Sequence, residues 1–177
     1  ARAHMPVHAA LRRRFAEAPP FAGQTIAVCS HIEAKTGVFL ETLAAAGATV
    51  VFTGSEPGSS QDDVVAALNA MPGITGYAKR GASETELAES HLAALAHGPD
   101  LILDDAAELT ARLVHQAPAH LAKLQGVCEQ TTTGVQRLQA MFAAGAAHFP
   151  AYAVNDTPMK HEFDNIHGTG ESSLTNL

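Results

Sequence analysis

The stretch Gly126-Val-Cys-Glu-Gln-Thr-Thr-Thr-Gly134 guides the interpretation of the whole chain. An apolar run from Leu124 to Cys128 is typical of a buried strand, and a helical spacing of apolar residues runs from Val135 to Phe142. The three threonines therefore lie where a strand ends and a helix begins. A helix cap needs only one hydroxyl. Three in a row favour a polar ligand site, and the alternative is one cap followed by two β-branched fillers.

Strand-like and helix-like segments alternate outward from this stretch. We expect strands at Gln24 to Cys29, Ala48 to Phe52, Ile74 to Ala78, Leu101 to Leu103, Leu124 to Cys128 and Ala151 to Val154. We expect helices at Val7 to Phe15, Glu33 to Ala46, Gln61 to Asn69, Glu84 to Ala96, Glu108 to His115 and from Val135 onward. This alternation predicts one α/β domain, a three-layer Rossmann-like fold with a mostly parallel sheet of about six strands.

The composition indicates a globular protein that binds neither nucleic acid nor membrane. The chain has 177 residues, 46% of them hydrophobic, and no apolar run approaches the ~20 residues of a membrane span. A net charge of −7 leaves no basic face for phosphates, and we interpret Arg12 to Arg14 as a solvated helical turn. Cys29 and Cys128 lie in apolar runs without zinc or redox spacing. We therefore expect buried thiols and a cytoplasmic protein.

Polar side chains follow several of the expected strands, at the point where each strand ends. They are His31, Asp104 and Asp105, the segment Glu129 to Thr133, and Asn155 with Asp156. In a parallel sheet these positions share the carboxyl edge, where open α/β sheets bind ligands. A single histidine at a strand end is usually a turn residue. The convergence of several polar groups is what predicts a functional site.

The tail from Asp156 to Leu177 leaves the strand and helix alternation and ends on a partly begun helix. Lys160 and Asp164 are spaced i, i+4, so on a helical turn they could both reach one small hydroxyl-bearing ligand. A surface ion pair is the alternative. The acids and histidines around them match no zinc signature, and we predict no metal site. Gly168-Thr-Gly170 lacks a preceding strand and a third glycine, which predicts a loop.

Several segments match one known family in order and in spacing. They are Leu101-Ile-Leu-Asp-Asp105, Glu129-Gln-Thr-Thr-Thr-Gly134, Val154-Asn-Asp156, Lys160 with Phe163-Asp-Asn165, and Ser30-His31 with Thr36. Together they resemble S-adenosylhomocysteine hydrolase, from about Met5 to the end of the chain. The Thr-Thr-Thr-Gly segment and the Lys-to-Asp-Asn segment are the specific parts of this resemblance.

The resemblance implies the substrate domain of an enzyme that works with tightly held NAD, as a homo-oligomer in its full-length form. That family oxidises the ribose 3′-hydroxyl, eliminates homocysteine, adds water at 5′ and reduces the ketone. Residues 1–177 would form a single substrate-binding domain, with 156–177 as an interdomain and active-site segment. No Gly-x-Gly fingerprint follows a strand, so we expect the NAD-binding domain outside this chain. A trimmed longer enzyme is favoured, and a separate cofactor-binding chain is the alternative.

The same resemblance assigns roles to individual residues. The expected catalytic residues are Lys160 and Asp164 at the 3′-hydroxyl, with Asp105 and His31 as acid and base near the 5′ carbon and the leaving sulfur. The expected substrate-binding residues are Gln130, Glu33, Lys35, Thr36 and Asn155. The expected contacts with the nicotinamide end of the cofactor are Thr131, Thr132, Thr133 and Asn165.

Three of these positions depart from the family pattern. Gln130 stands for a ribose-binding glutamate and keeps hydrogen bonding without the charge. Glu33 and Lys35 stand for a threonine and a glutamate that recognise the substrate, so Lys35 reverses the charge that faces adenine. We expect an enzyme that cleaves S-adenosylhomocysteine or a related nucleoside thioether. A family member for a different nucleoside, a non-catalytic nucleoside-binding relative and a domain with a purely structural polar edge are the alternatives.

Overall fold

Six parallel strands form one sheet in the computed structural model, which describes residues 1–175. The strands are β1 (Thr25–Ser30), β2 (Thr49–Gly54), β3 (Ile74–Gly76), β4 (Leu101–Asp104), β5 (Gly126–Glu129) and β6 (Ala151–Ala153). Their order is β3-β2-β1-β4-β5-β6, and every neighbouring pair is parallel. The order reverses between β1 and β4, which is where doubly wound sheets bind ligands. The predicted Rossmann-like α/β class is confirmed.

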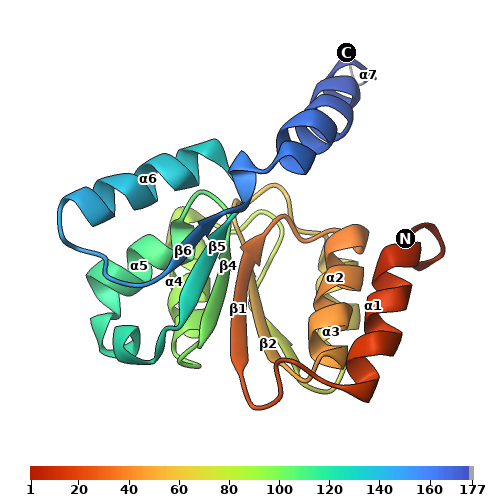
Figure 1. The fold of residues 1–177 in the computed structure, drawn as a ribbon, viewed down its shortest axis with the longest axis horizontal. Coiled ribbons are helices and arrows are strands. Elements are labelled where there is room, and N and C mark those ends of the chain that lie inside the picture. Colours follow the sequence, from red (N-terminus) through yellow and green to blue (C-terminus); the bar gives the residue numbers. More distant parts are fainter. Residues whose placement is uncertain (176–177) are drawn as a thin grey trace.

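Helices cover both faces of the sheet (Figure 1). One face carries α1 (Pro6–Glu17), α2 (Ala34–Ala45) and α3 (Asp62–Asn69), and the other carries α4 (Glu84–Leu95), α5 (Glu108–Gln116) and α6 (Thr132–Ala143). Two short 3-10 helices lie between these elements in the chain: η1 (Arg2–His4) precedes α1, and η2 (Pro118–Lys123) lies between α5 and β5. Within residues 1–175, no helix combines the length and the apolar character needed to cross a bilayer.

The central strands are apolar without interruption because each of their faces meets a helical layer. In β1, Ile26 and Val28 belong to the core beneath α2 and α3, whereas Ala27 and Cys29 belong to the core beneath α4, α5 and α6. All four are at most 2% exposed. An alternating polar pattern would expose one face, so the continuous run in this strand requires helices on both sides.

The N-termini of α4 and α6 are capped by their own side chains. Ser83 Oγ accepts from Glu86 N at 3.2 Å, and Glu86 accepts from Ser83 N at 2.8 Å, which is a capping box. Thr131 Oγ1 accepts from Gly134 N at 3.1 Å. The capping alternative for the threonine stretch is therefore confirmed for Thr131, and Thr132 begins the helix itself.

The C-terminal segment is more helical than the sequence predicts. After the 3-10 turn η3 (Val154–Asp156) come the π-helix η4 (Lys160–Glu171) and α7 (Ser172–Thr175), which stand away from the sheet in Figure 1. The loop predicted at Gly168-Thr-Gly170 was wrong. Ser173 Oγ donates to Thr169 O at 2.7 Å within this helical run, and glycine disfavours a helix interior without excluding it. Residues 176–177 of the predicted tail lie outside the described residues.

Candidate active site

His31 and Asp105 meet at the carboxyl edge, directly after the adjacent strands β1 and β4. His31 Nε2 lies 3.3 Å from Asp105 Oδ2, and Ser55 Oγ, which follows β2, lies 3.4 Å from His31 Nδ1. Asp105 is buried at 4% exposure, whereas the imidazole is open to solvent. The predicted convergence of strand-end groups is confirmed for this pair. An imidazole oriented at both nitrogens beside a carboxylate is suited to proton transfer.

Lys160 and Asp164 also meet, as their spacing predicts. Lys160 Nζ lies 2.7 Å from Asp164 Oδ2 and donates to Asn165 Oδ1 at 2.9 Å. Both contacts form because the wide turn of a π-helix places Asp164 and Asn165, which are four and five residues after Lys160, beside the lysine. The lysine side chain is 20% exposed and the aspartate 57% exposed. The ammonium is thus held between two oxygens, with room for a ligand at the carboxylate.

A cavity of about 510 Å³ lies at the point where the strand order reverses, and the C-terminal segment borders it. Predicted site residues on its wall are Lys35, Thr36, Gln130 and Asp164, beside the apolar Phe39 and Leu103. This volume is that of a small-molecule site. Ser30 and Asp104, the neighbours of His31 and Asp105 in the chain, also line it. Lys160 contacts Asp164, which lines the cavity.

The other predicted residues form smaller groups at the same edge. Lys35 Nζ lies 3.1 Å from Glu33 Oε1 at the start of α2, and Thr36 Oγ1 donates to His31 O at 2.6 Å. The buried Asn155 accepts from Thr132 Oγ1 at 3.3 Å and donates to Asp156 Oδ1 at 2.9 Å. Among residues 1–175, no hydrogen bond or ion pair joins Lys160 to His31 or Asp105. The structure therefore places Lys35, Thr36, Gln130 and Asp164 on the cavity wall, whereas the other predicted residues form separate contacts.

Asp104 is a buried carboxylate whose role the sequence did not predict. Its Oδ1 accepts from Asp105 N and Leu109 N at 3.0 and 3.2 Å, and its Oδ2 accepts from Thr110 N and Thr110 Oγ1 at 2.8 and 2.6 Å. It thereby caps α5, whose own N-cap position is an alanine. Burial, and to a smaller extent the nearby Glu129, raise the pKa of Asp104 to about 7 against the lowering effect of these bonds. The sequence feature that could have indicated this capping role is an acid at the last position of a hydrophobic strand.

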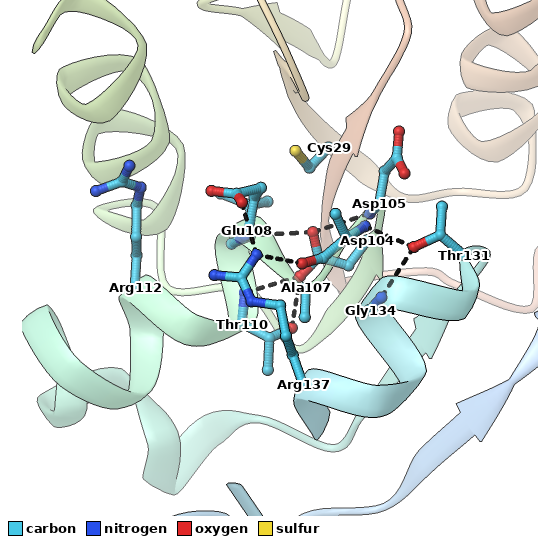
Figure 2. A network of polar contacts seen from close by, with 12 residues as sticks. Cys29, Asp104, Asp105, Ala107, Glu108, Thr110, Arg112, Thr131, Gly134 and Arg137 are labelled. Carbon is cyan, nitrogen blue, oxygen red and sulfur yellow. Dashed lines mark hydrogen bonds and ion pairs between the residues drawn. The ribbon is translucent and has the colours of Figure 1, made fainter. Parts of the chain in front are cut away.

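Glu129 is the second buried carboxylate, paired in register with Asp104 across β4 and β5 (Figure 2 shows the surrounding network). Its Oε2 accepts from Ala107 N at 2.8 Å, and its Oε1 accepts from Thr131 N and Oγ1 at 2.8 and 2.9 Å. Burial raises its pKa, and the bonds from Thr131 and Ala107 oppose that rise. Both acids were among the strand-end groups expected to converge, but the sequence assigned neither a catalytic nor a binding role, and both are buried in the fold.

The two cysteines differ in how deeply they are buried. Cys29 is 1% exposed, and burial together with the nearby carboxylates Asp104 and Asp105 raises its thiol pKa well above the usual value. Cys128 is less buried than predicted, because it faces the cavity. Within residues 1–175, no group of three or more His, Cys, Asp and Glu side chains is arranged to hold a metal ion.

The turn between β1 and α2 does not fit the pyrophosphate of a dinucleotide. This turn would have to place glycine at the helix N-terminus, but it carries Glu33 as the N-cap residue, and a carboxylate repels phosphate there. The N-terminus of α6 differs, because Thr132 and Thr133 are exposed in its first turn. The chain can therefore offer hydroxyls to one end of a cofactor. That these residues, Thr131 and Asn165 contact NAD stays a prediction.

Fold and site together define an open α/β domain with a cavity at the carboxyl edge of its sheet, where such domains bind ligands. More specifically, the chain belongs to the S-adenosyl-L-homocysteine hydrolase family, which matches residues 1–120 and 115–176. This confirms the family inferred from the motifs.

Curated relatives cover almost the whole chain. An adenosylhomocysteinase from Halobacterium salinarum is 47% identical over 98% of the chain and 41% of the relative. An S-inosyl-L-homocysteine hydrolase from Methanopyrus kandleri is 46% identical over 100% of the chain and 42% of the relative. The chain thus spans about two fifths of their length. A crystal structure of L-tryptophan dehydrogenase from Nostoc punctiforme covers 97% of this chain and 46% of its own at 13% identity, but its TM-score of 0.43 carries no functional argument.

Proposed function

We propose that residues 1–177 form the substrate-binding domain of an NAD-dependent enzyme that reversibly cleaves S-adenosylhomocysteine, or a related nucleoside thioether, to a nucleoside and homocysteine. The observation that carries this proposal is the Lys160, Asp164 and Asn165 cluster beside the cavity that Thr36 and Gln130 line. NAD, bound by a separate domain, would oxidise the ribose 3′-hydroxyl. Residues 156–177 would connect the domains, and the full-length protein would be a cytoplasmic homo-oligomer.

The side chains divide the work by their chemistry. Lys160 and Asp164 would hold and deprotonate the 3′-hydroxyl, because a donor and an acceptor lie side by side there. Gln130 can both donate to and accept from ribose hydroxyls. His31, paired with Asp105, would exchange protons near the 5′ carbon as the sulfur leaves and water adds. The buried Asn155 would support the cluster around Lys160 from η3.

Substituting Lys160→Met in the full-length protein tests this assignment. Methionine keeps the length of the side chain and removes the ammonium, so kcat for homocysteine release should fall by about 10²- to 10⁴-fold. Lys79→Met is the matched control, because Lys79 pairs with Glu86 on the surface, 61% exposed, away from the cavity. It should leave kcat unchanged. Retained turnover in Lys160→Met would contradict the role of this lysine.

The wild-type full-length protein tests the non-catalytic alternative. Ligand binding without bound NAD and without formation of a 3′-keto product would favour a non-catalytic relative.

A second candidate substrate is the inosine thioether, and the cavity wall favours it. Lys35 lines the cavity and lies 3.1 Å from Glu33. Hypoxanthine presents a carbonyl oxygen, which an ammonium can bond, and a ring N–H, which a carboxylate can accept. Adenine presents an amino donor at the first of these positions, so a lysine there disfavours it. Relatives named S-inosyl-L-homocysteine hydrolase are 45–46% identical to the chain.

The base preference can be measured with Lys35→Glu in the full-length protein. We expect wild-type kcat/KM to be higher for S-inosylhomocysteine than for S-adenosylhomocysteine, and the substitution to shift the ratio toward adenosyl by about 10-fold or more, since charge complementarity is reversed. Arg13→Glu, an equal charge change on the exposed side of α1, should leave the ratio unchanged. An unchanged ratio in Lys35→Glu would refute the base assignment without affecting the proposed reaction.

A further inference from the structure

The backbone directly after Asp105 has a conformation that is rare for alanine. Ala106 and Ala107 have φ angles of 59° and 54°, in the left-handed region. Among residues 1–175 they are the non-glycine residues with positive φ. A Cβ atom in this region lies too close to the following carbonyl oxygen, so the turn needs contacts that hold it.

The last residue of β5, Glu129, and the N-cap residue of α6, Thr131, supply those contacts; Figure 2 labels Ala107 and Thr131. Ala107 N donates to Glu129 Oε2 at 2.8 Å, and Ala106 N donates to Thr131 Oγ1 at 3.0 Å. Arg137 Nη1, from the second turn of α6, donates to Ala106 O at 2.6 Å. The backbone groups of the turn that face this segment are therefore bonded from outside the turn.

The groups that hold the turn are themselves fixed. Glu129 is 0% exposed, and its second oxygen accepts from the amide and the hydroxyl of Thr131. The Thr131 hydroxyl donates to Glu129 and accepts from both Ala106 N and Gly134 N, so its one donor and two acceptor sites are filled. Rotation of either side chain would break several bonds in the interior.

These contacts are separate from the cap of α5. Asp104 satisfies Leu109 N and Thr110 N in the first turn of that helix, and neither amide bonds to Glu129 or Thr131. Ala107, the second residue of the left-handed turn, is also the N-cap residue of α5, and the helix begins at Glu108. What the turn does determine is the course of the backbone at Asp105, whose carboxylate lies 3.3 Å from His31.

We propose that Glu129 and Thr131, together with Arg137, are positioning residues that hold the left-handed turn at Ala106 and Ala107 and thereby fix Asp105 opposite His31. The effect on catalysis rests on the proposed function, because it requires that Asp105 and His31 take part in the reaction. The effect on geometry does not depend on it, and the two can be measured separately.

The geometric part is tested by NMR on the 177-residue chain. Amide to Hα couplings and Cβ shifts of Ala106 and Ala107 report the left-handed conformation. We expect Glu129→Gln to lose this signature, because the Gln side-chain NH2 would face a backbone N–H donor where Glu129 has an acceptor oxygen. The Ala106 and Ala107 amides should then exchange at least ~10-fold faster. Glu108→Gln, which breaks only the ion pair of Glu108 with Arg137, should keep the signature. Retention of the signature in Glu129→Gln would overturn the proposal.

A second pair of variants covers the case in which Glu129→Gln does not fold. Thr131→Val keeps the shape of the side chain without the hydroxyl and should lose the turn, whereas Thr131→Ser should keep it. The consequence for Asp105 is read at His31. Adding Asp105→Asn should shift the His31 ring signals in the wild type but not in Thr131→Val, where the contact is already lost. An equal shift in both backgrounds would overturn the positioning role.

Glycine rescue in the full-length protein separates positioning from general stability. Glu129→Gln should lower kcat by about 10- to 100-fold with little change in KM, as expected for a displaced catalytic group. Adding Ala106→Gly and Ala107→Gly should restore most of kcat, because glycine adopts the left-handed turn without steric cost. A kcat that stays low despite the glycines indicates a merely structural role. An unchanged kcat, with the turn lost by NMR, would instead refute the proposed participation of Asp105.

Discussion

Replacing Gly134 with alanine should destabilise the domain by about 3 kcal/mol or more, because the new methyl group has no space. A Cβ at this position would overlap the Cδ and both carboxylate oxygens of Glu129. That carboxylate is fully buried and bonded to Ala107 and Thr131, so moving it would break hydrogen bonds inside the protein. Urea unfolding of the 177-residue chain, followed by circular dichroism, measures the loss.

Gly37→Ala is the matched control for this prediction. Gly37 also lies in the first part of a helix, α2, but an added Cβ would meet Val64 Cγ1 at 3.4 Å, an ordinary contact. Alanine should therefore be neutral or stabilise by up to ~1 kcal/mol, since glycine is the poorer helix former. Equal effects at the two positions would show that helix propensity, and not the buried carboxylate, governs Gly134.

Removing the Asp104 side chain should be the other large perturbation. Asp104→Ala leaves the amides of Asp105, Leu109 and Thr110 without their acceptor beneath the sheet edge. Buried unpaired donors cost ~1–3 kcal/mol each when no water reaches them, so we expect a loss of about 3 kcal/mol or more in urea unfolding. Asp63→Asn, an exposed acid in the first turn of α3, should change stability by less than ~0.5 kcal/mol. A small loss in Asp104→Ala would mean that α5 finds another cap.

Asp104 should also make stability depend on pH. Its pKa rises from 3.8 to about 7 on folding, so between these values the folded state keeps a proton that the unfolded state releases. The corresponding stabilisation is complete below about pH 4 and is lost as pH rises through 7. Relative to Asp104→Asn, the wild type should gain at least ~1 kcal/mol between pH 8 and pH 5. Groups that titrate in both proteins cancel in this difference, and a pH-independent difference would contradict the raised pKa.

The sequence predicted the architecture because the relevant signals are local. Continuous apolar runs such as Ile26 to Cys29 indicate strands covered on both faces, and the capping box at Ser83 and Glu86 is readable from four neighbouring residues. The meeting of His31 with Asp105 followed from the rule that parallel strands share one carboxyl edge. The family followed from motif order alone, and the family match confirms it.

The tertiary structure decided the chemistry of the interior at that edge. Asp104 and Glu129 lie 25 positions apart, and they become neighbours only because β5 pairs with β4 in the register that aligns them. Their burial, the raised pKa of Asp104 and the left-handed turn at Ala106 and Ala107 all depend on that pairing. The sequence by itself determined the order of strands and helices and the residues at their ends. Which of those residues face solvent and which hold the backbone depends on contacts between distant segments, and local sequence patterns do not encode these contacts.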